Sequence, residues 1–449
     1  MRVLFGTDGI RGKAHEYPLD IATMYALGEA LGHRLRANAP KPRVLLGMDT
    51  RESGPEIARA LSAGLAAGGG EATLIGVIPT PGAAYLCRTT DAVAAISISA
   101  SHNPFGDNGV KIFGHDGMKI PDAVEEQIED ELRAIRRDDV NVAETPLEES
   151  NELIESYERF LVSGVRRNAL NGRKVVLDAG HGAAYRIAAD VFRRVGAEVV
   201  VIHDAPNGTN INAKSGALHP ETLAKVVVQQ NADFGVAFDG DADRAIFADD
   251  AGNIRDGDEI IYLWAQHLRR TGKLKSDAVV TTVMSNFGFE KQLQADGIDL
   301  LRAQVGDKYV LELMLENGAI LGGEQSGHII DLTVHSTGDG IHTALVFGEI
   351  LSGLPKKFSQ LRTFEPMPQL LINQKVASKP PLESLPKFQA AQKKAVDELG
   401  RRGRVLVRYS GTENLVRVMA EGEDEAQIRK IAENLRDVLR DEIAVAVSS

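Results

Sequence analysis

The stretch KVVLDAGHGAAYRIAADVFRRVGAEVVVI (Lys174 to Ile202) decides the fold. A short apolar strand leads through a turn of small residues into a helix, and a glycine then leads into a second apolar strand. Ile187, Val191 and Val195 recur at the i, i+4, i+8 spacing that lets a helix bury one face on a sheet. The stretch therefore has the βαβ pattern of a mainly parallel sheet.

The same order of elements occurs twice more along the chain. In the first of these copies a helix carries Ile57, Leu61 and Leu65 on one face. The strands of that copy are expected at Arg43 to Gly47 and Glu71 to Val77. In the other copy, strands are expected at Ala278 to Val283 and Ile298 to Ala303, and a helix at Gly288 to Ala295. Three tandem α/β domains with mixed, mainly parallel sheets follow from the repetition.

The last part of the chain has a different pattern. Five prolines between Pro366 and Pro386 are typical of a linker or an irregular connection. Beyond them, RVLVRY (Arg404 to Tyr409) and LVRVMA (Leu415 to Ala420) flank a polar turn. A helix follows whose expected inward residues are Ile428, Ile431, Leu435 and Val438. Two strands backed by a helix predict a small α+β domain that could act as a lid.

Length and composition narrow the class of protein. A chain of 449 residues suggests three or four domains. The net charge of −12 argues against a nucleic-acid binder with a broad basic surface. Cys87 is the single cysteine, so an intrachain disulfide is impossible. No secretory signal or membrane span is expected from the apolar runs, and we expect a cytoplasmic protein.

The segment AISISASHNPFGDNGVKIF (Ala95 to Phe113) reads as a strand that stops in a polar turn and resumes as VKIF. Ser101, at the strand end, is expected to be exposed and reachable. Nearby, Lys111 offers a cation that could stabilise phosphoryl oxygens or exchange protons with a hydroxyl. Because Ser, Asn and Pro are common turn formers, a plain turn is an equally open interpretation of this segment alone.

Three carboxylates alternate in VAFDGDADRAIFAD (Val236 to Asp249), at Asp239, Asp241 and Asp243. They repel one another unless a cation lies among them, and oxygen ligands with open positions favour Mg²⁺. An EF-hand calcium loop is excluded, since Arg244 stands where the turn needs glycine. A solvated acidic turn is the alternative, which the apolar strands on both sides disfavour.

Near the C-terminus, RYSGTENLVRV (Arg408 to Val418) combines a turn with two arginines. The turn's N–H groups, its hydroxyls and the two guanidiniums would form a cradle for an anion, and arginine forks match phosphate geometry. A hairpin turn with surface arginines is the alternative. The cradle residues are Arg408, Ser410, Gly411, Thr412 and Arg417.

Two more polar turns carry candidate groups, GGEQSGH (Gly322 to His328) and VGDKY (Val305 to Tyr309). Glu324 and Ser326 could hydrogen-bond sugar hydroxyls or an amine, while His328 and Lys308 could meet phosphate or move protons. A lone histidine is more often structural.

AGHGAAY (Ala179 to Tyr185) imitates a dinucleotide-binding fingerprint, because it follows a strand and opens a helix. Tyr185 occupies the third glycine position, and its bulk would spoil the close helix packing that the fingerprint requires. We therefore interpret the segment as a structural βα turn.

SASHNP, DGDADR, GEQSGH and RYSGTEN follow one another in this order, one in each expected domain, and together resemble the α-D-phosphohexomutase superfamily over essentially the whole chain. The opening FGTDGIRG, the glutamine of GEQSGH and the run PNGTNIN (Pro206 to Asn212) are most similar to members that act on phosphorylated glucosamine. The resemblance implies four domains around a central cleft. Their expected ranges are 1–152, 153–253, 254–366 and 367–449.

The resemblance also implies a role for each matching residue. Ser101 would be the phosphorylated serine and, through its phosphate, a ligand of one Mg²⁺ held with Asp239, Asp241 and Asp243. Glu324 and Ser326 would hold the sugar, and the C-terminal cradle would bind the non-reacting phosphate. The groups expected around the reacting phosphate and the proton transfers are Arg11, Lys111, Arg244, Lys308 and His328.

The implied reaction interconverts glucosamine 6-phosphate and glucosamine 1-phosphate through a bisphosphorylated sugar, feeding UDP-N-acetylglucosamine synthesis. The partner would be the small phosphosugar, with no nucleic acid or membrane, and the protein a monomer or homodimer. A phosphomannomutase or phosphoglucomutase shares every catalytic part and is the first alternative. A serine-dependent metal phosphatase and a non-catalytic phosphosugar sensor are alternatives from other classes.

Overall fold

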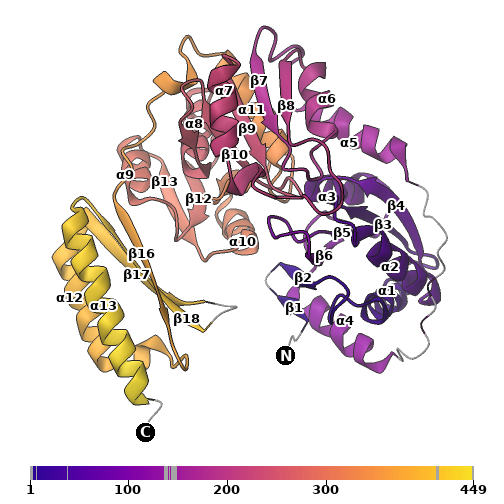
Figure 1. Ribbon diagram of the computed structural model, residues 1–449, viewed down its shortest axis with the longest axis horizontal. Coiled ribbons are helices and arrows are strands. Elements are labelled where there is room, and N and C mark those ends of the chain that lie inside the picture. The colour runs from indigo at the N-terminus through magenta and orange to yellow at the C-terminus, as the bar shows by residue number, and fades with distance from the viewer. Residues whose placement is uncertain are drawn as a thin grey trace. The chain divides into compact units, whose positions relative to one another are not determined.

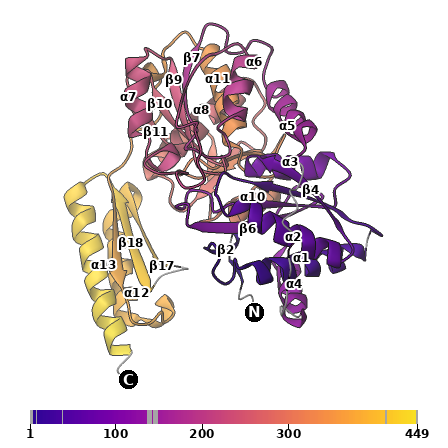
Figure 2. The same ribbon diagram turned by 45° about the vertical axis from the view of Figure 1, so that its right-hand side comes forward.

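A computed structural model describes residues 4–6, 8–37, 39–135, 140, 142, 149–410 and 414–446 of the protein. Residues 444–446 are described by their backbone only. The chain forms two compact units (Figures 1 and 2). The first unit contains Met1–Thr282 and Leu301–Arg362, and the second contains Val283–Leu300 and Thr363–Ser449. Among the described residues, no helix is both long and apolar enough to span a bilayer.

A six-stranded sheet in the order β1-β2-β6-β5-β3-β4 forms the N-terminal part of the first unit. β3 pairs in parallel with β4 and β5, whereas β6 pairs antiparallel with β5 and β2. Ile57, Leu61 and Leu65 of α2 are buried, as the spacing predicted. The elements are β1 (Phe5–Gly6), β2 (Gly9–Lys13), α1 (Ile21–Arg36), β3 (Arg43–Met48), α2 (Gly54–Ala67), β4 (Glu71–Val77), α3 (Thr80–Thr89), β5 (Ala94–Ile98), β6 (Asp107–Gly114) and α4 (Asp122–Ala134).

The second sheet has the order β11-β10-β9-β7-β8. β7 lies in parallel between β8 and β9, while β9 and β10 form an antiparallel hairpin that carries the acidic triplet in its turn. The two strands expected from the stretch that decides the fold are confirmed as β7 and β8. The elements are α5 (Asn151–Ser163), β7 (Lys174–Asp178), α6 (Ile187–Arg194), β8 (Glu198–Ile202), α7 (Glu221–Gln229), β9 (Phe234–Phe238), β10 (Ala245–Asp249) and β11 (Ile254–Arg255).

The third sheet, β13-β12-β14-β15, mixes parallel and antiparallel pairs. VGDKY is only partly a turn, because α10 begins at Asp307 directly after Gly306, whose φ of 132° favours glycine. The elements are α8 (Gly257–Arg270), β12 (Ala278–Thr282), α9 (Phe287–Ala295), β13 (Asp299–Ala303), α10 (Asp307–Asn317), β14 (Leu321–Gly323), β15 (Ile329–Asp331) and α11 (Gly340–Ser352).

The C-terminal part is an antiparallel sheet, β16-β18-β17, covered by α12 and α13 (Figure 1). The sequence predicted two strands, but the proline-rich segment contributes a third, β16, between Pro368 and Pro380. Of the four residues expected to face inward on the last helix, three are buried and Val438 is half-buried. The elements are β16 (Gln369–Lys375), α12 (Pro386–Leu399), β17 (Gly403–Tyr409), β18 (Leu415–Gly422) and α13 (Glu425–Ala446).

Candidate active site

Ser101 lies three residues beyond β5, in the left-handed region at φ 52°. The expectation that it is exposed is wrong, since only 1% of the residue is accessible. The turn between β9 and β10 covers it: a Cβ built on Gly240 would lie 2.4 Å from the Ser101 carbonyl oxygen. The Ser101 hydroxyl faces inward and donates a hydrogen bond to Asp239 Oδ2 at 2.6 Å. The nucleophile candidate and the acidic triplet are thus one site.

Asp239, Asp241 and Asp243 each place a carboxylate oxygen within 4.8 Å of the others. All three are buried. The second oxygen of Asp241 accepts from Thr80 Oγ1 at 2.6 Å and from Lys111 Nζ at 3.1 Å. Within the described residues, Asp241 Oδ1 and Asp243 Oδ1 are buried without a hydrogen-bond partner. Buried oxygens left unpaired in this way fit ligands of a hard divalent cation.

The charges in this cluster shift the pKa values in opposite directions. Burial, reinforced by Asp243 and Asp241, raises the pKa of Asp239 well above its usual value. Burial acts in the same sense on Asp243, but Lys111, His328 and Arg244 outweigh it and hold its pKa well below the usual value. The raised pKa of Asp239 shows that the neighbouring cations do not fully compensate its negative charge, and a bound divalent cation would stabilise its ionised form.

Lys111 approaches the triplet from β6 and is almost completely buried. Its Nζ lies 3.4 Å from Asp243 Oδ2 and 3.3 Å from Asp8 Oδ2, in addition to its contact with Asp241. Burial would lower the pKa of Lys111, but these carboxylates raise it well above its ordinary value. Lys111 is therefore an ammonium group facing the proposed site of phosphoryl transfer.

Arg11 and Arg244 supply further positive charge near Ser101. Arg244 donates through its backbone N–H to Asp239 Oδ1 at 3.1 Å, and its NH1 lies 3.0 Å from Nδ1 of His102. Burial, assisted by Arg244 and Arg11, lowers the pKa of His102 to about 4. His102 is consequently neutral near pH 7, which leaves the two guanidiniums as the cations on this side.

The two polar turns of the third sheet come together. Gly306 donates its backbone N–H to Glu324 Oε1 at 3.2 Å, and Ser326 Oγ donates to Glu324 Oε2 at 3.3 Å. The negative charge of Glu324 acts on Arg244, so this turn lies beside the acidic triplet. Gln325 points elsewhere, because its amide donates to Asp256, which caps α8.

His328 contacts the triplet through Nδ1, which lies 3.6 Å from Asp243 Oδ2. Its Nε2 accepts a hydrogen bond from the Gly338 N–H at 3.0 Å. The proton that Nδ1 carries faces Asp243. Burial would lower the pKa of His328, but Asp243, Asp307 and Glu324 raise it above its ordinary value. A Cβ on Gly338 would lie 2.7 Å from three atoms of the ring, so the histidine is tightly held. In this arrangement His328 orients a candidate metal ligand.

Lys308 does not reach Ser101 in the structure. Its Nζ pairs with Asp122 and lies 3.9 Å from Glu312. It lines a largely apolar cavity of about 210 Å³ between α10 and the segment before α4. The expected contact of Lys308 with substrate therefore requires this ion pair to open.

Sequence reasoning missed a chain of ion pairs that joins the first and third sheets. Asp8, within the quoted FGTDGIRG, contacts Lys111, Arg11 and Lys119. Lys119 Nζ also donates to Asp307 Oδ2 at 2.6 Å. Burial would raise the pKa of Asp8, but the three cations hold it far below its usual value. Asp8 and Asp307 stood in quoted segments, but nothing local indicated that one lysine bridges them.

The second unit holds the cradle residues. Arg408 and Arg417 face one another across β17 and β18. Burial and the Arg417 charge lower the pKa of Arg408, and an anion between the two guanidiniums would relieve their repulsion. Ser410 follows β17, and its carbonyl accepts from Lys379, a cation that sequence reasoning missed. Gly411 and Thr412 lie outside the described residues.

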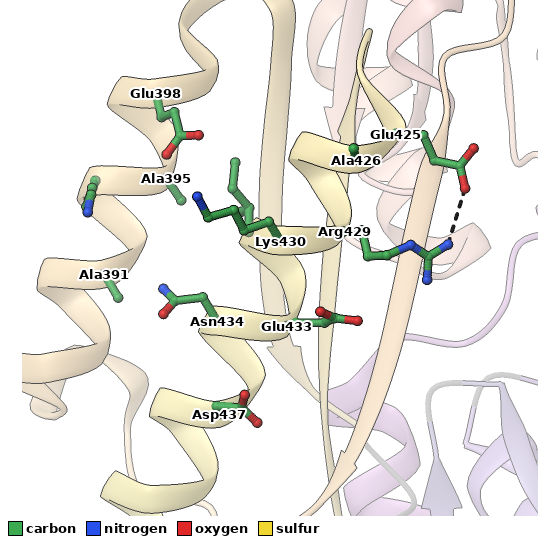
Figure 3. A pocket seen from close by; sticks show the side chains of 12 residues that line it. Ala391, Ala395, Glu398, Glu425, Ala426, Arg429, Lys430, Glu433, Asn434 and Asp437 are labelled. Carbon is green, nitrogen blue, oxygen red and sulfur yellow. Dashed lines mark hydrogen bonds and ion pairs between the residues drawn. The ribbon is translucent and has the colours of Figure 1, made fainter.

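A groove of about 810 Å³ lies elsewhere in the second unit, between α12 and α13 (Figure 3). Charged and apolar side chains line it, and Arg429 pairs with Glu425 at 3.2 Å. None of the candidate site residues lines this groove.

Four family models match the chain in order. Their descriptions are "Phosphoglucomutase/phosphomannomutase", alpha/beta/alpha domain I at residues 2–139, domain II at 154–252, domain III at 256–367 and the C-terminal domain at 371–438. The chain belongs to the phosphoglucomutase/phosphomannomutase family. The match confirms the resemblance to phosphohexomutases and the fold class of three α/β domains followed by a C-terminal α+β domain.

Individual members of this family resemble the chain over its whole length. A phosphoglucosamine mutase from Solibacter usitatus is 47% identical over 444 residues, which is 98% of this chain and 99% of the relative. A family protein from Burkholderia thailandensis has a similar fold, with a TM-score of 0.81 at 23% identity and 98% of each chain covered. Aspergillus fumigatus N-acetylphosphoglucosamine mutase, solved with GlcNAc-6P and magnesium, gives a TM-score of 0.63 at 17% identity, covering 98% of this chain and 96% of its own.

Proposed function

We propose that the protein is a phosphoglucosamine mutase, an isomerase that interconverts glucosamine 6-phosphate and glucosamine 1-phosphate and so feeds UDP-N-acetylglucosamine synthesis. One observation carries the chemistry: the hydroxyl of Ser101 lies 2.6 Å from Asp239 within a buried triplet of carboxylates. The substrate assignment is supported by full-length relatives named phosphoglucosamine mutase at 41 to 47% identity.

One Mg²⁺ per chain would be held by Asp239, Asp241 and Asp243 together with an oxygen of phosphorylated Ser101. The buried oxygens of Asp241 and Asp243 that accept no hydrogen bond among the described residues support this assignment, and the fungal relative in complex with magnesium agrees with it. The ion, when bound, neutralises negative charge on the phosphoryl group. Carboxylate oxygens are ligands that Mg²⁺ prefers, and phosphate and water oxygens would suit it equally.

The residues of the chain divide the remaining work. As the bond from phosphorus to Ser101 Oγ breaks, the anomeric oxygen of the sugar forms a bond to the same phosphorus. The Lys111 ammonium group donates a proton to Ser101 Oγ as that oxygen leaves phosphorus, and the resulting amine takes up the proton that the sugar hydroxyl gives up. We assign His328, through its contact with Asp243, to the same exchange. Arg11 and Arg244 stabilise the charge on the transferring group. The bisphosphorylated sugar then turns over and returns its 6-phosphoryl group to Ser101, which leaves glucosamine 1-phosphate.

The other candidate residues bind the substrate. Glu324 and Ser326 hold the amino sugar, and Lys308 joins them after leaving Asp122. The cradle residues Arg408, Ser410, Gly411, Thr412 and Arg417 bind the non-reacting phosphate, which the mutual repulsion of the two arginines supports. We also propose the domain limits 1–152, 153–253, 254–366 and 367–449, a cytoplasmic location, and a monomer or homodimer that binds no nucleic acid.

The relatives favour this proposal over a phosphatase, because full-length relatives at 41 to 47% identity are named phosphoglucosamine mutase. A mutase must also pass the phosphoryl group to a bound sugar and not to water, which requires water to be kept from the phosphoserine during transfer.

Competition among hexose phosphates tests the substrate assignment. Phosphorus NMR of the protein with Mg²⁺ and glucosamine, glucose or mannose 6-phosphate should show kcat/KM at least about tenfold higher for glucosamine 6-phosphate. Equal or greater turnover of glucose or mannose phosphate would assign a phosphoglucomutase or phosphomannomutase. Stoichiometric release of inorganic phosphate would assign a phosphatase, and binding of all three sugars by the phosphorylated protein without turnover would assign a sensor.

A further inference from the structure

We infer that Arg51 and Asn212 are positioning residues that hold the main chain of Ser101 from two different segments of the chain. The two residues are called the backbone clamp below. Arg51 lies between β3 and α2, and Asn212 ends the PNGTNIN run that follows β8. Neither belongs to the catalytic or metal-binding groups proposed above, and the inference rests on the proposed function only for its effect on turnover.

Arg51 has a fully buried side chain whose guanidinium bonds to the segment from Ser101 to Asp107. Its NH2 donates to the Ser101 carbonyl oxygen at 3.0 Å and to the Asn103 carbonyl oxygen at 2.8 Å. Its NH1 donates to the carbonyl oxygens of Pro104 and Asp107, the latter at 3.0 Å. A guanidinium that contacts four carbonyls of one loop fixes the course of that loop, because its donors form a rigid fork.

Asp49 links this guanidinium to the other end of the Ser101 peptide unit. Arg51 Nε donates to Asp49 Oδ2 at 2.9 Å, and the same oxygen accepts from Ser99 Oγ at 2.6 Å. Ser99 Oγ in turn accepts from the Ser101 N–H at 2.9 Å. Both backbone polar groups of Ser101 are therefore held by one connected network of buried groups.

Asn212 contacts the same carbonyls from the second sheet's side. Its Nδ2 donates to Ser101 O at 2.9 Å and to Asn103 O at 3.1 Å. The backbone N–H of Asn212 donates to Gly180 O at 2.9 Å, which ties Asn212 to the AGHG turn after β7. Gly182 of that turn packs against Gly240, since a Cβ there would lie 2.5 Å from the Gly240 carbonyl oxygen. The AGHG turn, which resembled a dinucleotide-binding fingerprint, thus packs against the turn that carries the acidic triplet.

The clamp acts on carbonyls and leaves the Ser101 hydroxyl free for Asp239. It can therefore hold the same backbone whether the serine carries a phosphoryl group or not. Ser101 needs such support, because its φ of 52° is unfavourable for a residue with a side chain. Loss of a clamp contact should displace the phosphoryl carrier relative to the carboxylates, and small displacements of a reacting group are costly in rate.

Asn212→Gly tests the clamp, with Asn210→Gly as the matched control. Glycine accepts the φ of 58° at position 212, so the variant removes the side-chain donors without adding strain. Asn210 lies in the same run, and among the described residues its side chain hydrogen-bonds within its own loop, to Asn207 and Ala205. In both variants the added glycine raises the conformational entropy of the unfolded chain by a similar amount.

We expect Asn212→Gly to lower kcat about 10²-fold with KM for glucosamine 6-phosphate changed less than about threefold, while Asn210→Gly keeps the parent kcat within about twofold. Hydrogen exchange of the amides at residues 99–106 should quicken in Asn212→Gly alone, with melting temperatures of the two variants alike. Unchanged exchange, equal kcat in the two variants, or a loss confined to KM would overturn the inference. The exchange comparison needs no turnover, so it still decides if the parent proves inactive as a mutase.

Discussion

Replacing Ser101 with alanine is expected to abolish isomerisation, with kcat lowered at least about 10⁴-fold. Alanine lacks the oxygen that would carry the phosphoryl group. Among the described residues, the other hydroxyl seen to donate to the triplet is that of Thr80, and it bonds to Asp241. Added glucosamine 1,6-bisphosphate should not rescue the variant, because the missing element is the carrier and not the priming phosphate. Phosphorus NMR of the sugar pool measures the result.

The control for this variant is Ser163→Ala, which replaces an exposed serine at the end of α5. In the described part of the chain its hydroxyl donates to Phe160 O of its own helix. It should retain the parent kcat. The melting temperature of Ser101→Ala should stay near that of the parent, since the backbone clamp contacts main-chain atoms that alanine keeps. If the alanine variant is as active as the parent, Ser101 does not carry the phosphoryl group.

Asp241→Asn is expected to lower kcat/KM about 10²- to 10³-fold at a fixed, subsaturating Mg²⁺ concentration. The amide has the shape of the carboxylate but not its charge, so the affinity for a hard cation falls. It also loses the charge that faces Lys111 Nζ at 3.1 Å. Titration calorimetry with Mg²⁺ alone should show weaker binding by at least about tenfold.

Asp190→Asn serves as the matched control, because Asp190 is an exposed carboxylate on α6 far along the chain from the triplet. It should bind Mg²⁺ and turn over substrate as the parent does. If Asp241→Asn binds Mg²⁺ with the parent affinity, the triplet is not the metal site. If both variants lose activity equally, the effect is one of net charge.

The α/β repeats were predictable because their signal is local. Ile57, Leu61 and Leu65 mark the buried face of α2 without reference to any other part of the chain. The strand β16 was missed because prolines on both sides suggested a connection, and its burial pattern only alternates between exposed and half-buried. It is a strand through its pairing with β18, which no single window contains.

The candidate site was predictable in its residue types and not in its contacts. Ser101 and the acidic triplet stood out as motifs, yet the burial of Ser101 arises from a turn more than a hundred residues away. Asn212 stood at the end of the PNGTNIN motif and Lys119 in no motif, yet the contacts of both were unforeseen. Lys119 bridges Asp8 to Asp307, and Asn212 reaches carbonyls of a different domain. Long-range partners of single polar residues are invisible to spacing rules.

The fate of the phosphoryl group on Ser101 tests the central claim most directly. Protein labelled on Ser101 by radioactive hexose 1,6-bisphosphate, freed of sugar and mixed with unlabelled glucosamine 6-phosphate and Mg²⁺, should pass its label to the sugar in one turnover. We expect labelled glucosamine bisphosphate and monophosphate to appear, with almost no labelled inorganic phosphate. Label that stays on the protein, or that appears mainly as inorganic phosphate, would contradict it.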